Sequence, residues 1–102
     1  MALPVVYRSK VGRDLAAAFD YYELQVEGLG EQFLGAINSV FDAIARYPEM
    51  FASVHREVRR ALVTRFPYAV FYRVEAKRIV VLAVLHTARD PRLWPQSRKT
   101  AR

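Results

Sequence analysis

The sequence predicts an α+β domain of order β-α-α-β-β-β, in which a helical hairpin packs on one face of an antiparallel sheet. Three observations predict it. The first half holds two stretches whose apolar residues are spaced by three and four, as in amphipathic helices. The second half holds alternating or continuously apolar stretches, which are typical of strands. The connections between those strands are too short for parallel crossovers, so they should form an antiparallel meander.

The first half should contain one short strand and the two helices. β-branched and aromatic residues over 4–8 favour a strand, and Ser9 is expected to cap a helix over 10–26. A short turn with two glycines leads to the second helix, 31–47, which Pro48 ends. Two helices joined so closely should form an antiparallel hairpin whose apolar stripes need a third surface to cover.

The second half should supply that surface. Residues 54–66 are strand-like, with His55 in a polar loop before the strand proper, and residues 68–74 alternate clearly. Residues 79–85 are apolar at both parities, as expected for a central strand covered on both faces. The residues of the alternating strand expected to face the helices are Tyr68, Val70, Tyr72 and Val74.

Length and composition exclude several classes of protein. The 102 residues suit one domain, expected over 1–95, followed by a basic tail over 96–102 that is expected to be frayed. The sequence has no cysteine, which excludes disulfides, thiolate metal sites and a cysteine nucleophile. No apolar run approaches the roughly 20 residues of a membrane span, and no signal peptide is visible. The lack of cysteine fits a reducing cytoplasm, and we expect a cytoplasmic protein without a membrane partner.

The net charge of +6 is unevenly distributed. Residues 1–53 carry seven acidic and four basic side chains, whereas residues 54–102 carry three acidic and twelve basic ones, ten of them arginine. Arginine suits planar, bidentate contact with phosphate or carboxylate. A polyanion, an acidic protein or simply a solvated surface is compatible with this excess.

The candidate site lies on the sheet face that the helices leave uncovered. A subset of Arg59, Arg65 and Arg73 is expected to converge there, with Arg60 at the opposite parity, although a slip of one residue would invert the assignment. His86 ends the central strand at the parity of Val80, Leu82 and Val84. It could act as a general acid or base, or it could cap the strand through hydrogen bonds.

Residues after the last strand complete the candidate set. Asp90 precedes a proline and could pair with Arg89 or Arg92. Trp94, the only tryptophan, could cover an edge of the core or stack on a base or a partner side chain; we favour the first interpretation. The sequence has no glycine-rich phosphate loop and no nucleophile elbow, and it has no metal-ligand cluster. We therefore expect no metal and no cofactor.

Several segments, in this order, resemble RelE/ParE-type toxins. In the hairpin they are residues 15–23, 28–34 and 44–48, and in the strands they are residues 59–62, 65–68, 70–74 and 84–86. Arg89-Asp90-Pro91 with Trp94 looks like one branch of the family. The resemblance covers about residues 5–95. It implies the toxin of a bacterial type II toxin–antitoxin (plasmid stabilisation) system, which a small cognate antitoxin binds in a hetero-oligomer.

The resemblance implies two alternative targets and leaves open whether the chain is an enzyme. One branch of the family cleaves mRNA on the ribosome, and there the resemblance assigns catalytic roles to Arg65 and His86. The other branch poisons DNA gyrase without catalytic residues of its own. The basic residues expected to bind the target or the antitoxin are Arg59, Arg60, Arg73 and Arg89, with Trp94.

Two departures from the nuclease pattern favour the gyrase branch. No tyrosine follows the last strand, since the last one is Tyr72, and the three lysines form no cluster. The resemblance therefore favours ParE-like inhibition of gyrase, with RelE-like cleavage of ribosome-bound mRNA as the alternative. A non-toxic module that only binds the antitoxin is the third possibility.

Overall fold

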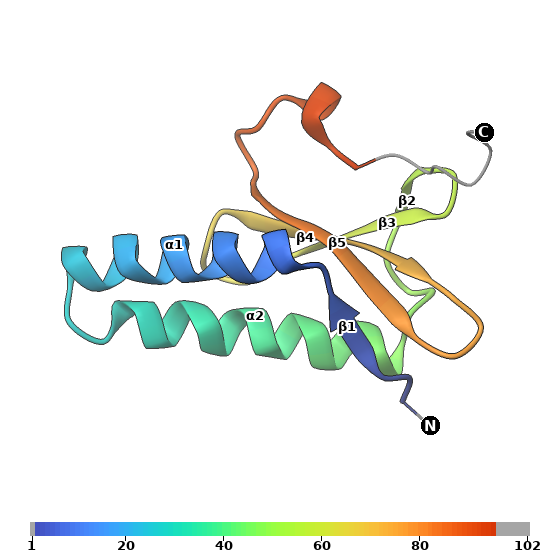
Figure 1. Ribbon diagram of the computed structural model, residues 1–102, viewed down its shortest axis with the longest axis horizontal. Coiled ribbons are helices and arrows are strands. Elements are labelled where there is room, and N and C mark those ends of the chain that lie inside the picture. The colour runs from blue at the N-terminus through green and yellow to red at the C-terminus, as the bar shows by residue number, and fades with distance from the viewer. Residues whose placement is uncertain (1, 96–102) are drawn as a thin grey trace.

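The computed structural model describes residues 2–95, so the expected tail over 96–102 lies outside the described residues. Five strands form one sheet of order β1-β5-β4-β3-β2, and two antiparallel helices lie side by side against it (Figure 1). The elements are β1 (Val5–Tyr7), α1 (Ser9–Gln25), α2 (Leu29–Arg46), β2 (Ser53–His55), β3 (Val58–Leu62), β4 (Tyr68–Val74), β5 (Ile79–His86) and the 3₁₀ helix η1 (Pro91–Leu93). The predicted α+β class is confirmed.

The sheet differs from the prediction in two respects. It is mixed, because β1 pairs in parallel with β5 while the other strands pair antiparallel. The hairpin between β1 and the meander provides the crossover that a parallel pair requires. The single strand expected over 54–66 is in fact β2 and β3, separated by a turn in which Arg56 has a φ of 53°. His55 therefore belongs to a strand and not to a loop.

Neither helix of the hairpin has a side-chain hydrogen bond from its N-cap residue. Ser9 is the first helical residue, and the cap position belongs to Arg8, whose side chain makes no capping bond; the expected serine cap is wrong. Arg8 is still held in the sheet, since its N–H bonds the carbonyl oxygen of Val81. At the other end of α1, Gly28 takes a left-handed φ of 88° and α2 follows immediately.

A carboxylate from α1 secures this turn. Glu23 accepts hydrogen bonds from the backbone N–H groups of Gly28 at 2.8 Å and Gly30 at 3.0 Å. These are N–H groups that the start of α2 would otherwise leave without partners. Gly30 is buried against the ring of Phe19. The short turn between the helices therefore depends on the Glu23 carboxylate as a hydrogen-bond acceptor and on the lack of a side chain at Gly30.

The main core lies between the hairpin and the sheet. Its centre is an aromatic cluster around Phe33, which is fully buried. The ring centroid of Phe33 lies 5.3 Å from that of Tyr22, 5.4 Å from Phe66 and 5.1 Å from Tyr68. Such pairs add to the stabilisation from buried area alone. The prediction that alternate β4 residues face the helices is confirmed, because Tyr68, Val70, Tyr72 and Val74 all belong to this core.

A second, smaller core lies on the other face of the sheet. Its buried members are Val58, Ala69, Phe71, Val80, Leu82 and Leu85. Trp94 packs against it, with its ring centroid 5.2 Å from that of Phe71. Strand β5 contributes to both cores, which confirms the prediction of a central strand covered on both faces.

A bulge in β5 changes which face its residues occupy. Phe71 pairs with Ala83 and Tyr72 pairs with Val81, so Leu82 is an extra residue without a partner in β4. Val81 and Val84 consequently both face the helices, although they differ in parity. The residues beyond the bulge lie on the opposite face from the one that simple alternation predicts.

Two glycines of α2 provide a matched test of this packing. A Cβ on Gly30 would lie 2.8 Å from Phe19 and 2.9 Å from a Glu23 oxygen, whereas a Cβ on Gly35 would meet nothing within 4 Å. We expect Gly30→Ala to lower the free energy of unfolding by about 1–3 kcal/mol, because the core and the turn must shift. We expect Gly35→Ala to raise it by about 0.5–1 kcal/mol through helix propensity. Urea unfolding of the two variants checks both signs; equal effects would contradict the close contact at Gly30.

Candidate functional site

The arginines expected to converge on one face do not meet. Arg59 pairs across the strands with Tyr72, and Arg73 pairs with Val58. Since Tyr72 belongs to the main core and Val58 to the second, these two arginines lie on opposite faces of the sheet. Arg65 lies on neither face but in the turn before β4, with a φ of 74°. The predicted convergence is therefore wrong, because the register between β3 and β4 places odd-numbered residues of the two strands on different faces.

Arg59 holds the segment that follows α2. Its Nη1 donates hydrogen bonds to the carbonyl oxygens of Glu49 at 3.2 Å and Phe51 at 2.6 Å. The hydroxyl of Tyr72 donates to the carbonyl oxygen of Pro48 at 2.6 Å. Burial raises the pKa of Tyr72 to about 12, so this phenol remains a neutral donor. The structure therefore gives Arg59 a positioning role in the fold.

Arg60 and Trp94 form a pair on the second face. The guanidinium carbon of Arg60 lies 5.0 Å from the centroid of the Trp94 ring, within the range of a cation–π interaction. Trp94 also contacts Phe71 of the second core. The favoured interpretation of Trp94, that it covers an edge of the core, is confirmed.

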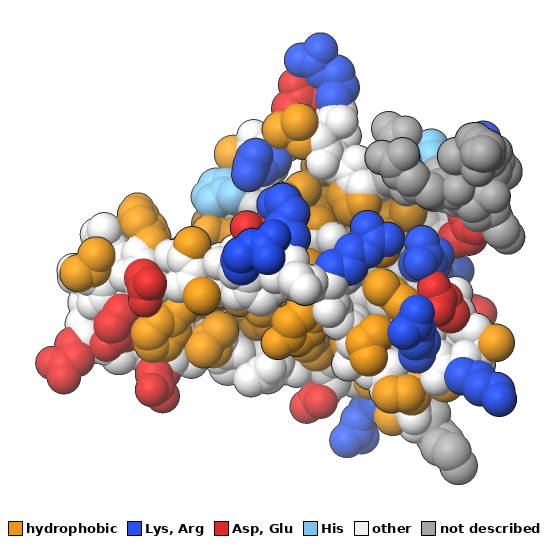
Figure 2. Space-filling model, viewed as in Figure 1, with side chains coloured by type: hydrophobic (Ala, Val, Ile, Leu, Met, Phe, Trp, Pro, Cys, Tyr) orange, Lys and Arg blue, Asp and Glu red, His pale blue; other side chains and the backbone are white. Residues whose placement is uncertain are grey.

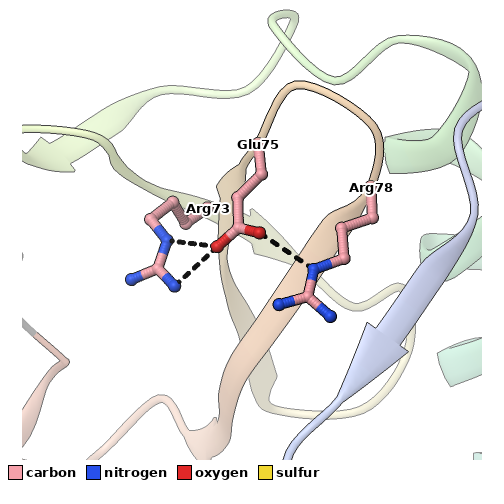
Figure 3. Close-up of polar contacts among 3 residues, drawn as sticks. All are labelled: Arg73, Glu75 and Arg78. Atoms are coloured by element: carbon pink, nitrogen blue, oxygen red, sulfur yellow. Dashed lines mark hydrogen bonds and ion pairs between the residues drawn. The ribbon is translucent and has the colours of Figure 1, made fainter.

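Arg73 and Arg78 share one carboxylate, as Figure 3 shows. Arg73 Nη2 lies 2.8 Å from Glu75 Oε2, and Arg78 Nε lies 2.9 Å from Glu75 Oε1. The hydrogen bonds from Arg78 and Arg73 hold the pKa of Glu75 below its ordinary value. The pair of arginines keeps a net positive charge of one, at the turn between β4 and β5.

His86 lies on the helix side of the sheet, away from the second-face arginines. It pairs with Tyr68, and their ring centroids are 5.4 Å apart. The expectation that it shares a face with Val80 and Leu82 is wrong, because the bulge at Leu82 intervenes. Its Nδ1 accepts a hydrogen bond from the backbone N–H of Ala88 at 3.0 Å. A neutral His86 in this geometry carries its proton on Nε2, which makes that atom a donor and not a base.

A pocket of about 280 Å³ lies between α1 and the ends of β4 and β5. Its lining residues are Asp14, Ala17, Ala18, Tyr21, Tyr68, Val84, Leu85, His86 and Arg89; we call it the Arg89 pocket. Figure 2 shows blue and pale-blue side chains gathered above α1 near this end of the sheet. Asp14 is paired with Lys10 at 3.0 Å. Arg89 is exposed and makes no ion pair with any residue in 2–95.

Sequence reasoning missed the helical side of this pocket. Asp14, Ala17, Ala18 and Tyr21 recur at the spacing of one helix face. Tyr21 stands out on that face because it is 57 % exposed. The sequence-level signal was an aromatic residue off the apolar stripe of the helix, which points away from the core.

A second concavity lies on the other side of α1. This apolar groove has a volume of about 470 Å³ and runs between the two helices beside β1. Its lining residues are Tyr7, Gly12, Leu15, Ala16, Phe19, Asp20, Leu34, Ile37, Asn38 and Phe41. The hairpin from residue 8 to residue 46, its turn included, carries six acidic and four basic residues. The groove therefore suits an apolar segment, with basic residues favoured at its rim.

The remaining candidates have local partners or none. Asp90 pairs with Arg92 at 2.7 Å, and its side chain accepts from the backbone N–H of Arg92 at the start of η1. These contacts lower the pKa of Asp90. Arg65 is exposed beside Phe66 at the β3–β4 turn. Residues 2–95 contain no group of acidic or histidine side chains able to hold a metal ion, and neither helix is long and apolar enough to cross a bilayer.

The fold and these surfaces define a small α+β protein with a hairpin groove and a basic pocket. Comparisons with known proteins show its family. The model of a family described as the ParE toxin of the type II toxin–antitoxin system parDE matches residues 5–91. The chain belongs to this family. It is also similar in fold to a chain of the chromosomal ParDE TA system from P. aeruginosa, with a TM-score of 0.62 and 21 % identity over 83 % of this chain and 96 % of that one. The comparison with curated proteins gives no match.

The shared carboxylate of Glu75 gives a pH-dependent prediction. Because its pKa is lowered in the folded state, the charged form stabilises the fold above the unfolded pKa, and this is lost as pH falls through the folded pKa. We expect Glu75→Gln to lower the free energy of unfolding slightly at pH 7. The difference in unfolding free energy between wild type and Glu75→Gln should narrow as the pH falls through the folded-state pKa of Glu75. Urea unfolding measured from pH 7 down through this pKa checks the prediction, with the exposed Glu27→Gln as control. A difference that does not change with pH would contradict the shared ion pair.

Proposed function

We propose that this toxin stops growth by binding and inhibiting DNA gyrase until its cognate antitoxin binds it. The observation that carries the proposal is the separation of the residues a nuclease would need. Arg65 lies at the β3–β4 turn, Arg59 holds a loop, and His86 ends β5 on the helix side. Catalysis of RNA cleavage needs a base and a cation on the same phosphodiester. Inhibition by binding needs only a complementary surface.

The hydrogen bond at His86 Nδ1 supports binding over catalysis. In the alternative, RelE-like function, His86 would take the proton of a ribose hydroxyl. Its Nδ1 is already engaged with Ala88 N–H, and the exposed Nε2 carries the proton in the neutral ring. His86 can therefore donate a hydrogen bond to a partner, but in this geometry it is not a general base.

The apolar groove supports an antitoxin partner. A ParD-type antitoxin segment is the natural occupant, since the similar structure belongs to a ParDE system. The segment would lay its apolar side between α1 and α2, over Leu15, Phe19 and Ile37. Binding in this way would form a toxin–antitoxin hetero-oligomer. We infer a cytoplasmic location for the toxin, where it would meet both the antitoxin and gyrase.

The proposal predicts direct inhibition of the enzyme. Purified toxin added at stoichiometric concentration should block supercoiling of relaxed plasmid by gyrase, and prior addition of the antitoxin should restore it. Supercoiling measured on agarose gels checks both results. Normal supercoiling, together with codon-positioned cuts in mRNA on programmed ribosomes, would instead establish the nuclease alternative.

The proposal also predicts the order of events in cells. Expression without the antitoxin should stop DNA synthesis before protein synthesis, because a poisoned gyrase blocks replication while existing mRNA is still translated. Incorporation of labelled thymidine and of labelled methionine, followed in parallel, checks this order. Arrest of translation first would contradict gyrase as the target, and unimpaired growth would indicate a non-toxic antitoxin-binding module.

A further inference from the structure

The Arg89 pocket has an unused positive charge. Of its two ionised residues besides histidine, Asp14 is neutralised by Lys10 at 3.0 Å. Arg89 has no carboxylate within residues 2–95, because the neighbouring Asp90 is paired with Arg92. The other arginines of β3 and β4 have structural partners in a carbonyl, a ring or Glu75. Arg89 is thus a free guanidinium beside a concave surface.

Neutral hydrogen-bond donors accompany this charge. His86 Nε2 carries a proton, because Nδ1 accepts from Ala88 N–H. The phenols of Tyr21 and Tyr68 also line the pocket. Burial raises the pKa of Tyr68, even though the charge of Arg89 acts in the opposite direction, so Tyr68 stays protonated. The floor is apolar, formed by Ala17, Ala18 and Val84. Donors around an apolar floor suit an anionic group that is partly desolvated.

The charge count favours a carboxylate over a phosphate backbone. The pocket offers one unpaired cation, which balances the single charge of an aspartate or glutamate. A guanidinium also matches a carboxylate through two parallel hydrogen bonds. Nucleic acid would need a track of several cations along successive phosphates, and here Asp14 stands on the pocket wall. An acidic side chain of a protein is therefore the better fit.

The position of the pocket favours the target protein over the antitoxin. The α1 residues Gly12, Leu15 and Phe19 line the hairpin groove, while Asp14 and Tyr21 line the Arg89 pocket. The two sites share no residue and lie on different sides of the same helix. The apolar groove has the chemistry for an antitoxin helix, which leaves the basic pocket for a different partner.

We propose that the Arg89 pocket binds an acidic side chain on the surface of gyrase, with Arg89 pairing to the carboxylate and His86 Nε2 donating to it. This rests on the proposed function, because it names the chemistry through which the toxin recognises that target. The contact anchors the toxin on the enzyme and requires no catalytic step.

Charge reversal with a matched control tests the proposal. Arg89→Glu places a negative charge in the pocket, whereas Arg13→Glu makes the same change at an exposed α1 residue that lines neither concavity. Arg89→Glu should raise the toxin concentration that half-inhibits supercoiling by at least about tenfold, as for loss of a paired charge at an interface. Arg13→Glu should change it by less than about threefold, as for a rim charge. Arg89→Lys keeps the charge but loses the planar guanidinium that can make two parallel hydrogen bonds, so its half-inhibiting concentration should lie between those of the other two variants.

Two further measurements make the result specific. All variants should have the far-UV circular dichroism spectrum and the urea unfolding midpoint of wild type, which shows that they are folded; if Arg89→Glu does not, the comparison is made with the milder Arg89→Gln. A fluorescent DNA duplex should bind wild type and Arg89→Glu equally weakly. Equal loss of inhibition in Arg89→Glu and Arg13→Glu would overturn the proposal, and so would a loss of DNA binding that accounts for the loss of inhibition. If wild-type toxin does not inhibit gyrase at all, the proposed function itself fails and this inference fails with it.

Discussion

Strand β5 must be apolar on both faces, and the rest of the structure follows from this constraint. Its residues pack under the helical hairpin on one side and under Trp94 on the other. No buried polar or charged residue occurs in the part of the chain that the structure describes, as expected where burial without a partner is costly. The charges of the basic half are therefore confined to strand ends, turns and the strands farther from β5. The candidate binding residues lie at the sheet margins for this reason.

The aromatic cluster around Phe33 links the hairpin to those margins. Phe66 belongs to the cluster, and it immediately follows Arg65, whose φ of 74° is unfavourable for a side chain with a Cβ. Packing of Phe66 against Phe33 and Tyr22 fixes the turn and so compensates for the strain. The exposed position of Arg65 is thus a consequence of core packing. Its place in the family pattern does not by itself indicate a catalytic role.

Helices and strands were predictable where periodicity is strong, as in α2 and β4. The faces of the β5 residues after Leu82 were not, because one extra residue at Leu82 lies within a run that is apolar at every position. Nothing in such a run distinguishes a bulge from regular alternation. The error carried over to His86, and the turn at Arg56 likewise split a strand whose pattern was already mixed. The sheet face on which a side chain lies after a bulge depends on the hydrogen-bond register, and this register cannot be read from a single sequence.

The two sides of α1 have a consequence for how an antitoxin neutralises this toxin. A helix seated only in the hairpin groove contacts Leu15 and Phe19 but leaves the Arg89 pocket open. Under the proposed mode of recognition, groove binding alone would then permit a complex of toxin, antitoxin and gyrase together. Exclusion of gyrase requires the antitoxin to extend around α1 and present an acidic residue of its own to Arg89, or to block the approach by its bulk. The first route would make neutralisation sensitive to the same charge that binds the target, so the antitoxin and gyrase would compete for one guanidinium.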